Sequence, residues 1–183
     1  MLKTEYIEVP DYSENIGKYI LNVYREICPE NPYDLMEHEF IFYSNHRRYQ
    51  FCKDDHRLQE VIDEHKHTLK ASFTEQNVWL PVSMYDHSGQ TIWVGQPNDD
   101  WDSGLFGIIA YPKSRIEQDF GTNAEDNALS FLEGVVKEVN DYYQGEVWRY
   151  ELTDQNGEVR DSCSGFYGSL EEVLPMIKED LPK

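Results

Sequence analysis

The stretch from Val78 to Pro112 constrains the fold more than any other part of the sequence. It holds three runs rich in Val, Ile, Trp, Tyr and Phe, at Val78–Tyr85, Thr91–Gln96 and Leu105–Tyr111. Corners of Asp, Asn, Ser, Gly and Pro separate these runs, which is the pattern of adjacent antiparallel strands. Asp and Ser side chains bond nearby backbone groups, and Gly adopts a positive φ without steric cost. The stretch therefore predicts neighbouring strands joined by tight corners.

These corners place polar side chains at strand ends, where a rigid sheet can present them. The first corner is Asp86-His87-Ser88-Gly89 and the second is Trp101-Asp102-Ser103-Gly104. They can be structural turns, or a partner-binding surface with Trp101 as its aromatic anchor. A third interpretation is a metal or proton-transfer site, because His titrates near neutral pH. Neighbours on a strand point to opposite faces, so Asp86 and His87 need not converge.

The rest of the chain predicts an α+β domain. In the first half we expect a strand at Thr4–Val9 and helices from Ser13 to about Ile27 and from Asp55 to about Leu69. After the three strands we expect a helix at Lys113–Phe120 ended by Gly121, a helix from the capping-box pattern Thr122–Glu125 to near Gly145, and a hairpin of Glu146–Thr153 and Glu158–Ser164. A final helix starts with the capping box Ser169–Glu172 and is expected to be kinked or shortened by Pro175. Strands that cluster between helical regions favour a mainly antiparallel sheet with hairpins, packed by helices on one face.

The length and the composition set further bounds. A chain of 183 residues suits a single domain over residues 1–183, with a possible N-terminal appendage over residues 1–30 and the weakest seam at Cys28–His38. No run of about 18 apolar residues occurs, and the N-terminus has no apolar signal-peptide core, so we expect a cytoplasmic protein. The 3 cysteines lack metal spacing and are expected to be reduced thiols.

The charge is strongly acidic and unevenly spread. A net charge of −19 argues against nonspecific nucleic-acid binding and fits either solubility alone or docking onto a basic partner. From His46 to Lys70, however, six Lys and Arg residues stand against five acidic residues, so this segment carries +1 and the remainder −20. Four of the six histidines also lie in this segment. It is the part of the chain best suited to meet phosphate.

A basic cluster within this segment is the first candidate site. Two short β-prone runs, Glu39–Tyr43 and Arg48–Cys52, predict a β-hairpin with its tip at Ser44–Arg47. The candidate RNA-contact or catalytic residues are Asn45, His46, Arg47, Arg48 and Tyr49. Arg can fork onto phosphates, Tyr can stack on a base, and His can transfer a proton in RNA transesterification. The structural alternative is a basic tip that is merely solvated.

Several enzyme signatures are absent from the sequence. It contains no phosphate loop, no GxSxG, no HExxH, no paired CxxC and no calcium loop. Two further histidines, His65 and His67, are two residues apart and would not share a helix face. We expect no metal site and no cofactor, although a metal-dependent enzyme built on Asp86, His87 and Asp102 stays open as an alternative.

Five short motifs carry a family resemblance. They are PENP at Pro29–Pro32, NHRRY at Asn45–Tyr49, MYDHSG at Met84–Gly89, WDSG at Trp101–Gly104 and DSCSGFYG at Asp161–Gly168. In this order they resemble a family of small proteins from phages, plasmids and integrative elements of Firmicutes, which includes type II-A anti-CRISPR proteins that inhibit Cas9. The chain departs from the pattern at Leu105-Phe106, where the family has Gln-Val, and at Ser164, where it has Trp.

The resemblance implies a function. It implies inhibition of Cas9 through its guide-RNA complex in the bacterial cytoplasm. One class of such inhibitors causes the guide RNA to be trimmed while it is bound to Cas9, and a β-hairpin of the inhibitor is important for the cutting. An acidic protein binds free RNA poorly, so contact with guide RNA is expected only in the presence of Cas9. The alternative is an acidic, non-enzymatic protein that occludes the Cas9 nucleic-acid groove. The oligomeric state and the Cas9 orthologue stay open.

Overall fold

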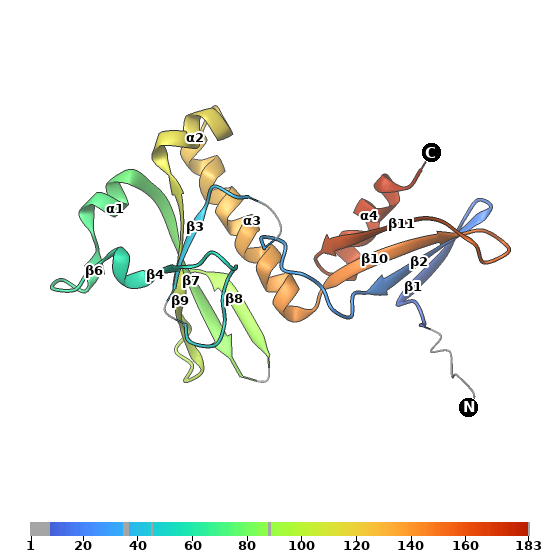
Figure 1. The fold of residues 1–183 in the computed structure, drawn as a ribbon, viewed down its shortest axis with the longest axis horizontal. Coiled ribbons are helices and arrows are strands. Elements are labelled where there is room, and N and C mark those ends of the chain that lie inside the picture. Colours follow the sequence, from blue (N-terminus) through green and yellow to red (C-terminus); the bar gives the residue numbers. More distant parts are fainter. Residues whose placement is uncertain (1–7, 35–36, 45, 88, 183) are drawn as a thin grey trace. The chain divides into compact units, whose positions relative to one another are not determined.

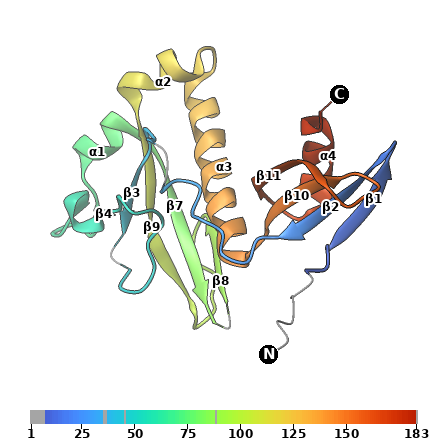
Figure 2. The same cartoon turned by 45° about the vertical axis from the view of Figure 1, so that its right-hand side comes forward.

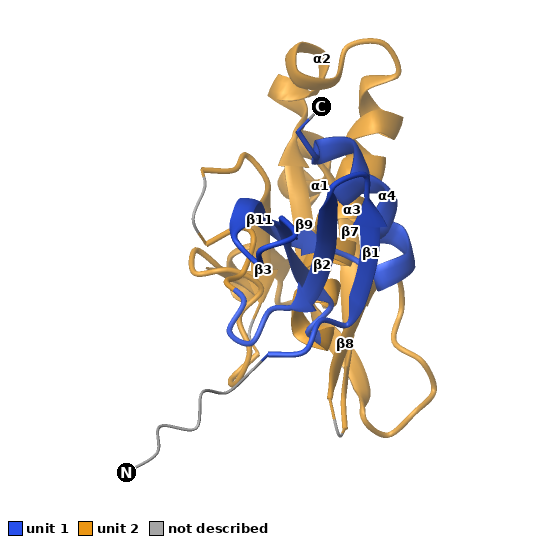
Figure 3. Cartoon of the chain, turned by 90° about the vertical axis from the view of Figure 1, so that its right-hand side faces the viewer, with its two compact units in different colours: residues 1–29, 145–183 blue, residues 30–144 orange. Residues whose placement is uncertain are grey.

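The computed structural model describes residues 8–34, 37–44, 46–87 and 89–182. These residues form an α+β structure whose strands pair almost entirely antiparallel, so the predicted fold class is confirmed (Figure 1). The chain divides into two compact units, drawn in different colours in Figure 3. Unit 1 combines the segment up to Pro29 with the segment from Gly145 on, and unit 2 is Glu30–Gln144. The first boundary falls within the seam predicted at Cys28–His38.

Unit 2 is built on a five-stranded sheet. Its strand order is β4 (His56–Arg57), β3 (Ile41–Ser44), β9 (Ser103–Pro112), β7 (Asn77–Asp86) and β8 (Gln90–Val94). All neighbouring strands pair antiparallel except β3 and β4. The three strands predicted between Val78 and Pro112 are thus confirmed as β7, β8 and β9, and they form adjacent strands of one sheet.

The helices α1, α2 and α3 pack against this sheet. The helix α3 (Ala124–Gln144) packs against β7, β8 and β9, and Figure 2 shows it running along the sheet beside α2 (Lys113–Phe120). Its apolar stripe, including Leu132 and Val139, is buried with the phenylalanines of the main core. Residues of β9 alternate between this core and a smaller cluster beneath α1 (Ala71–Gln76). Both predicted helices, α2 and α3, are confirmed.

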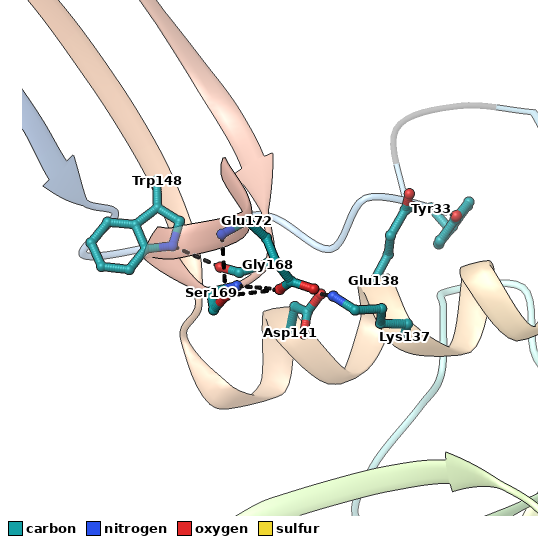
Figure 4. Close-up of polar contacts among 8 residues, drawn as sticks. All are labelled: Tyr33, Lys137, Glu138, Asp141, Trp148, Gly168, Ser169 and Glu172. Atoms are coloured by element: carbon teal, nitrogen blue, oxygen red, sulfur yellow. Dashed lines mark hydrogen bonds and ion pairs between the residues drawn. The ribbon is translucent and has the colours of Figure 1, made fainter. Parts of the chain in front are cut away.

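Unit 1 is a four-stranded antiparallel sheet with one helix. The strand order is β1 (Tyr12–Ile16), β2 (Tyr19–Arg25), β10 (Val147–Thr153) and β11 (Val159–Tyr167). The predicted hairpin of β10 and β11 is confirmed, and the helix α4 (Leu170–Asp180) buries Val173 and Ile177 against the sheet residues. Ser169 and Glu172 form the predicted capping box, drawn in Figure 4. The helix continues past Pro175 to Asp180.

The helix predicted from Ser13 to about Ile27 is wrong, because this segment forms the hairpin of β1 and β2. Gly17 adopts a φ of +62° at the two-residue turn, a conformation that Gly supplies without strain. Leu21 and Val23 are two residues apart and both buried, as on the inner face of a strand. Pairing of β2 with β10, which joins the two ends of the chain, overrides the helical spacing of the apolar residues.

The hairpin predicted from Glu39–Tyr43 and Arg48–Cys52 is also wrong. The first run is a strand, β3, but its partners are β9 and β4, and residues 48–52 form an irregular loop. The Asp55 carboxylate accepts hydrogen bonds from the backbone of Phe51 and Cys52, at 2.8 and 2.9 Å. Phe51 and Cys52 are consecutive and both buried, which a half-buried strand does not allow.

The helix predicted from Asp55 to about Leu69 is wrong too. The segment contains β4, a 3₁₀ turn at Leu58–Glu60, and the small hairpin of β5 (Ile62–Asp63) and β6 (Thr68–Leu69). The Asp63 side chain accepts backbone hydrogen bonds from His65 and Lys66, which closes the turn. His67 has a φ of +53°, which an α-helix excludes.

Two remaining expectations concern the N-terminus and membranes. Of the strand predicted at Thr4–Val9, the first four residues lie outside the described part, and the rest of it is not in a strand. None of the helices in the described ranges combines the length and the apolar character needed to cross a bilayer. The single-domain expectation stays a prediction, because compact packing units do not establish which parts fold independently.

Candidate functional site

The two candidate clusters of the sequence meet at one hollow on unit 2. Three segments form it: the loop after β3, the end of β7 and the corner that leads into β9. The hollow has a volume of about 370 Å³. Its lining residues are His46, Arg48, Met84, Asp86, Trp101, Asp102, Ser103, Gly104, Leu105 and Phe106. We call this site the β7–β9 hollow.

A β-bulge in β9 shapes the floor of the hollow. The register between β7 and β9 shifts after Val82, so that Phe106 has no direct partner on β7. The Phe106 ring is buried, and its carbonyl oxygen accepts a hydrogen bond of 2.7 Å from Ser44 Oγ. Ser44 Oγ in turn accepts one of 3.0 Å from the His46 backbone. The bulge thereby fixes where the loop after β3 begins.

The His46 ring is held in place by its neighbours, and its partial burial favours the neutral imidazole. It stacks on Tyr49 at a centroid distance of 5.2 Å and meets the edge of Phe106 at 5.5 Å. Partial burial lowers the His46 pKa, the Asp86 charge opposes this, and the Arg48 charge adds to it. Nδ1 accepts the Tyr49 backbone N–H at 3.2 Å, which leaves the proton on Nε2. In this tautomer Nε2 carries the proton and is not a proton acceptor.

The Asp86 carboxylate contacts the polar side chains on one side of the hollow. Its Oδ1 accepts the Tyr49 hydroxyl at 3.1 Å, and the same hydroxyl accepts Gln90 Nε2 at 2.9 Å. Arg48 Nη1 reaches Asp86 Oδ2 only at 3.5 Å, and its side chain is 76% exposed. Tyr49 is therefore a positioning residue with both its ring and its hydroxyl engaged, whereas Arg48 is a weakly held surface cation.

The two corners are tied to each other at the rim. The Asp86 backbone N–H donates to the Asp102 carbonyl oxygen at 3.1 Å. His87 Nδ1 lies 3.4 Å from Asp102 Oδ2, and both side chains are substantially exposed. The Trp101 indole is 98% exposed. The Ser103 hydroxyl oxygen is buried and has no hydrogen-bond partner among the described residues.

The sequence-predicted residues thus fall into three groups. His46, Arg48, Asp86 and the corner Trp101-Asp102-Ser103 converge on the hollow, and Tyr49 supports it. Arg47 is exposed beside it in the same loop, and His87 contacts it only through Asp102. Asn45 and Ser88 lie outside the described residues. Within the described ranges, no three His, Cys, Asp or Glu side chains are placed to hold a metal ion.

Sequence reasoning missed several residues that build the site. Ser44 and Gln90 are ordinary polar residues at strand ends, and only the paired strands reveal the hydrogen bonds they make. Leu105 and Phe106 line the hollow and directly follow the corner Trp101–Gly104. Their place beside a candidate corner was the one available signal that they belong to the site.

Comparisons with known proteins add nothing to this description. No protein-family model, no curated protein and no solved structure matches the chain.

Proposed function

We propose that this protein inhibits type II-A Cas9 by docking onto its guide-RNA complex, with the β7–β9 hollow and its rim as the contact surface. The observation that carries the proposal is the convergence of two sequence-distant motifs, NHRRY and MYDHSG, with WDSG at one hollow. Antiparallel pairing of β3 and β7 with β9 brings the ends of β3 and β7 beside the start of β9, and the exposed polar groups of the three motifs gather at that edge. The cytoplasm of a bacterial host is the compartment in which this function would operate.

The side chains at the hollow favour binding over bond cleavage. His46 has its Nδ1 engaged by the Tyr49 backbone, so it is poorly placed to abstract a proton from a ribose hydroxyl. The Tyr49 hydroxyl is bonded on two sides. Arg47 and Arg48 remain exposed cations that suit phosphate contact, while the net charge of −19 favours approach to a basic protein. Inhibition by occlusion therefore fits these groups best.

The test uses Cas9, guide RNA and a target duplex, with and without this protein. The expected result is blocked target cutting with a guide of unchanged length on a denaturing gel. Arg48→Ala should weaken the inhibition, whereas Lys66→Ala should not, because Lys66 is equally exposed at 76% but lies outside the hollow. Normal target cutting at saturating protein would refute the proposal.

Guide cleavage is the second candidate function, and one observation favours it. The His87–Asp102 pair, at 3.4 Å through Nδ1, leaves Nε2 of His87 available as a proton acceptor. A guide that is shortened only when Cas9 is present would support this candidate. His87→Ala should then abolish the shortening, and a lane without Cas9 should show intact RNA.

A further inference from the structure

The strand β8 is an edge of the five-stranded sheet that is suited to pair with a further strand. It has 5 residues, whereas β4 at the opposite edge has only 2. The β8 sequence, Gln-Thr-Ile-Trp-Val, is rich in β-branched and aromatic residues and contains no charge and no proline. Its ladder with β7 runs without a bulge. Charges, prolines and bulges are the usual features that keep an edge strand from pairing with another chain, and β8 has none of them.

The alternation along β8 decides which of its backbone groups face away from β7. The Gly95 N–H donates to the Pro81 carbonyl oxygen of β7 at 2.9 Å, so every second residue counted back from Gly95 turns its backbone toward β7. The backbone groups of the residues in between, Gln90, Ile92 and Val94, therefore point to the edge of the sheet. A row of such groups is the template onto which another strand adds.

Two side chains of α3 bond to this edge. Asn140 Oδ1 accepts the Ile92 backbone N–H at 2.9 Å. Gln144 Nε2 donates to the Gln90 carbonyl oxygen and, at 2.9 Å, to the Thr91 hydroxyl oxygen. These side chains thus take an N–H and a C=O group that a further strand would need.

The geometry of a helix beside a strand makes this arrangement possible. Positions four apart on a helix are separated by about 6 Å along its axis, and positions two apart on a strand by about 6.6 Å. Asn140 and Gln144 are four apart, and the groups they bond, on Ile92 and Gln90, are two apart. One helix that packs against β8 can therefore bond successive outward groups of the strand.

From these contacts we propose that Asn140 and Gln144 form a built-in block on the β8 edge, which prevents β8 from pairing with the β8 strand of a second copy of this chain. A second copy is the occupant excluded, because each copy would bring the same uncharged, β-prone strand. Strand addition has to displace both side chains before it gains its own hydrogen bonds. Nothing in this block depends on Cas9 or on the β7–β9 hollow.

The double variant Asn140→Ala/Gln144→Ala tests the block by sedimentation equilibrium over a concentration series. High salt is used, because it screens the repulsion between acidic copies. The double variant should self-associate at least about tenfold more tightly than the unchanged protein, since no bond to the edge has to be displaced. The matched control is Asn127→Ala/Gln118→Ala. Asn127 also lies on α3, but it donates to carbonyl oxygens before the helix and not to β8, so the control should sediment like the unchanged protein.

Amide hydrogen exchange, read by NMR, locates the association. At low concentration the Ile92 amide should exchange about tenfold faster in Asn140→Ala than in the unchanged protein, whereas the Trp93 amide, which faces β7, should not change. Asn140→Asp keeps an oxygen acceptor and should leave the Ile92 amide protected. At high concentration of the double variant the Ile92 amide should be protected again, because the strand of the second copy accepts its N–H.

Three results would overturn the proposal. They are equal self-association of the double variant and the unchanged protein, an equal gain in the matched control, and association that leaves the Ile92 amide unprotected. Tighter association in the double variant alone, with Ile92 protected again, supports it. Unchanged amide signals away from β8 show that a variant is folded. If the double variant does not fold, Gln144→Ala takes its place in the same comparison, because that side chain is exposed.

Discussion

Replacing Gly107 with alanine is the sharpest test of how this fold supports its site. Gly107 lies on β9 opposite Ser44 of β3. A Cβ atom built there would lie 2.4 Å from the Tyr43 carbonyl oxygen and 2.7 Å from two carbons of the Phe42 ring. Neither neighbour can yield easily, because one is backbone and the other is a buried ring stacked on Phe51 at 4.2 Å.

The expected cost follows from that geometry. Overpacking a core by one methyl group typically costs about 1–3 kcal/mol, and these contacts are closer than ordinary ones by roughly an ångström, so we expect about 3 kcal/mol. For a chain of this length that corresponds to a melting temperature lower by roughly 6–12 °C. Separation of β3 from β9 would also disturb the hydrogen bond from Ser44 to Phe106 that begins the His46 loop.

Differential scanning calorimetry measures the effect, and Gly134→Ala is the matched control. Gly134 lies in α3, and a Cβ atom there would meet nothing within 4 Å. That substitution should stabilise the protein by about 0.5–1 kcal/mol, because alanine loses less backbone entropy in a helix. If Gly107→Ala melts within about 2 °C of the unchanged protein, the close approach of β3 to β9 is wrong.

Three further predictions address the site, a cap and a thiol. The NMR titration of His46 should give a pKa below 6.5, and Asp86→Asn should lower it further. With a lowered pKa in the folded state, the His46 ring binds more protons in the unfolded state at pH values below 6.5. The free energy of unfolding should therefore rise with pH in that range, and a free energy of unfolding in urea that does not change with pH there would contradict this. Ser169→Ala should cost about 1 kcal/mol in urea unfolding by removing the cap of α4, whereas Ser162→Ala on exposed β11 should cost far less. Burial raises the Cys52 pKa to about 12, so a thiol reagent at pH 8 should label the two exposed cysteines and leave Cys52 unlabelled until the protein unfolds.

The sequence by itself determined the elements whose signals are local. The corners after Tyr85 and Gln96 fixed β7, β8 and β9, because turn residues act within a few positions. Capping chemistry fixed the start of α4, and Asn156-Gly157 fixed the hairpin of β10 and β11. Of the candidate residues at those corners, His87 and Trp101 are exposed, whereas Asp86, Asp102 and Ser103 are half-buried.

Only the tertiary structure decided how the remaining segments fold. The apolar residues from Ser13 to Ile27 satisfy a helical spacing, but β10 offers β2 a full row of backbone hydrogen bonds and a shared core. In the loop after β3, the backbone N–H groups of Tyr49 and Phe51 donate hydrogen bonds to the side chains of His46 and Asp55. The sequence pattern did not predict these bonds. Long-range pairing outweighs weak local propensity in the first segment, whereas in the loop after β3 side-chain hydrogen bonds over three and four residues replace the backbone ladder of a strand.

The site follows the same division. The residue types of the β7–β9 hollow could be found in the sequence, because His, Arg, Asp and Trp at strand ends already suggest binding. Their convergence could not, because it depends on the bulge at Phe106 and on the pairing of β3 with β9. Distances between side chains from different strands are set by register, and register is decided only when the whole sheet has assembled.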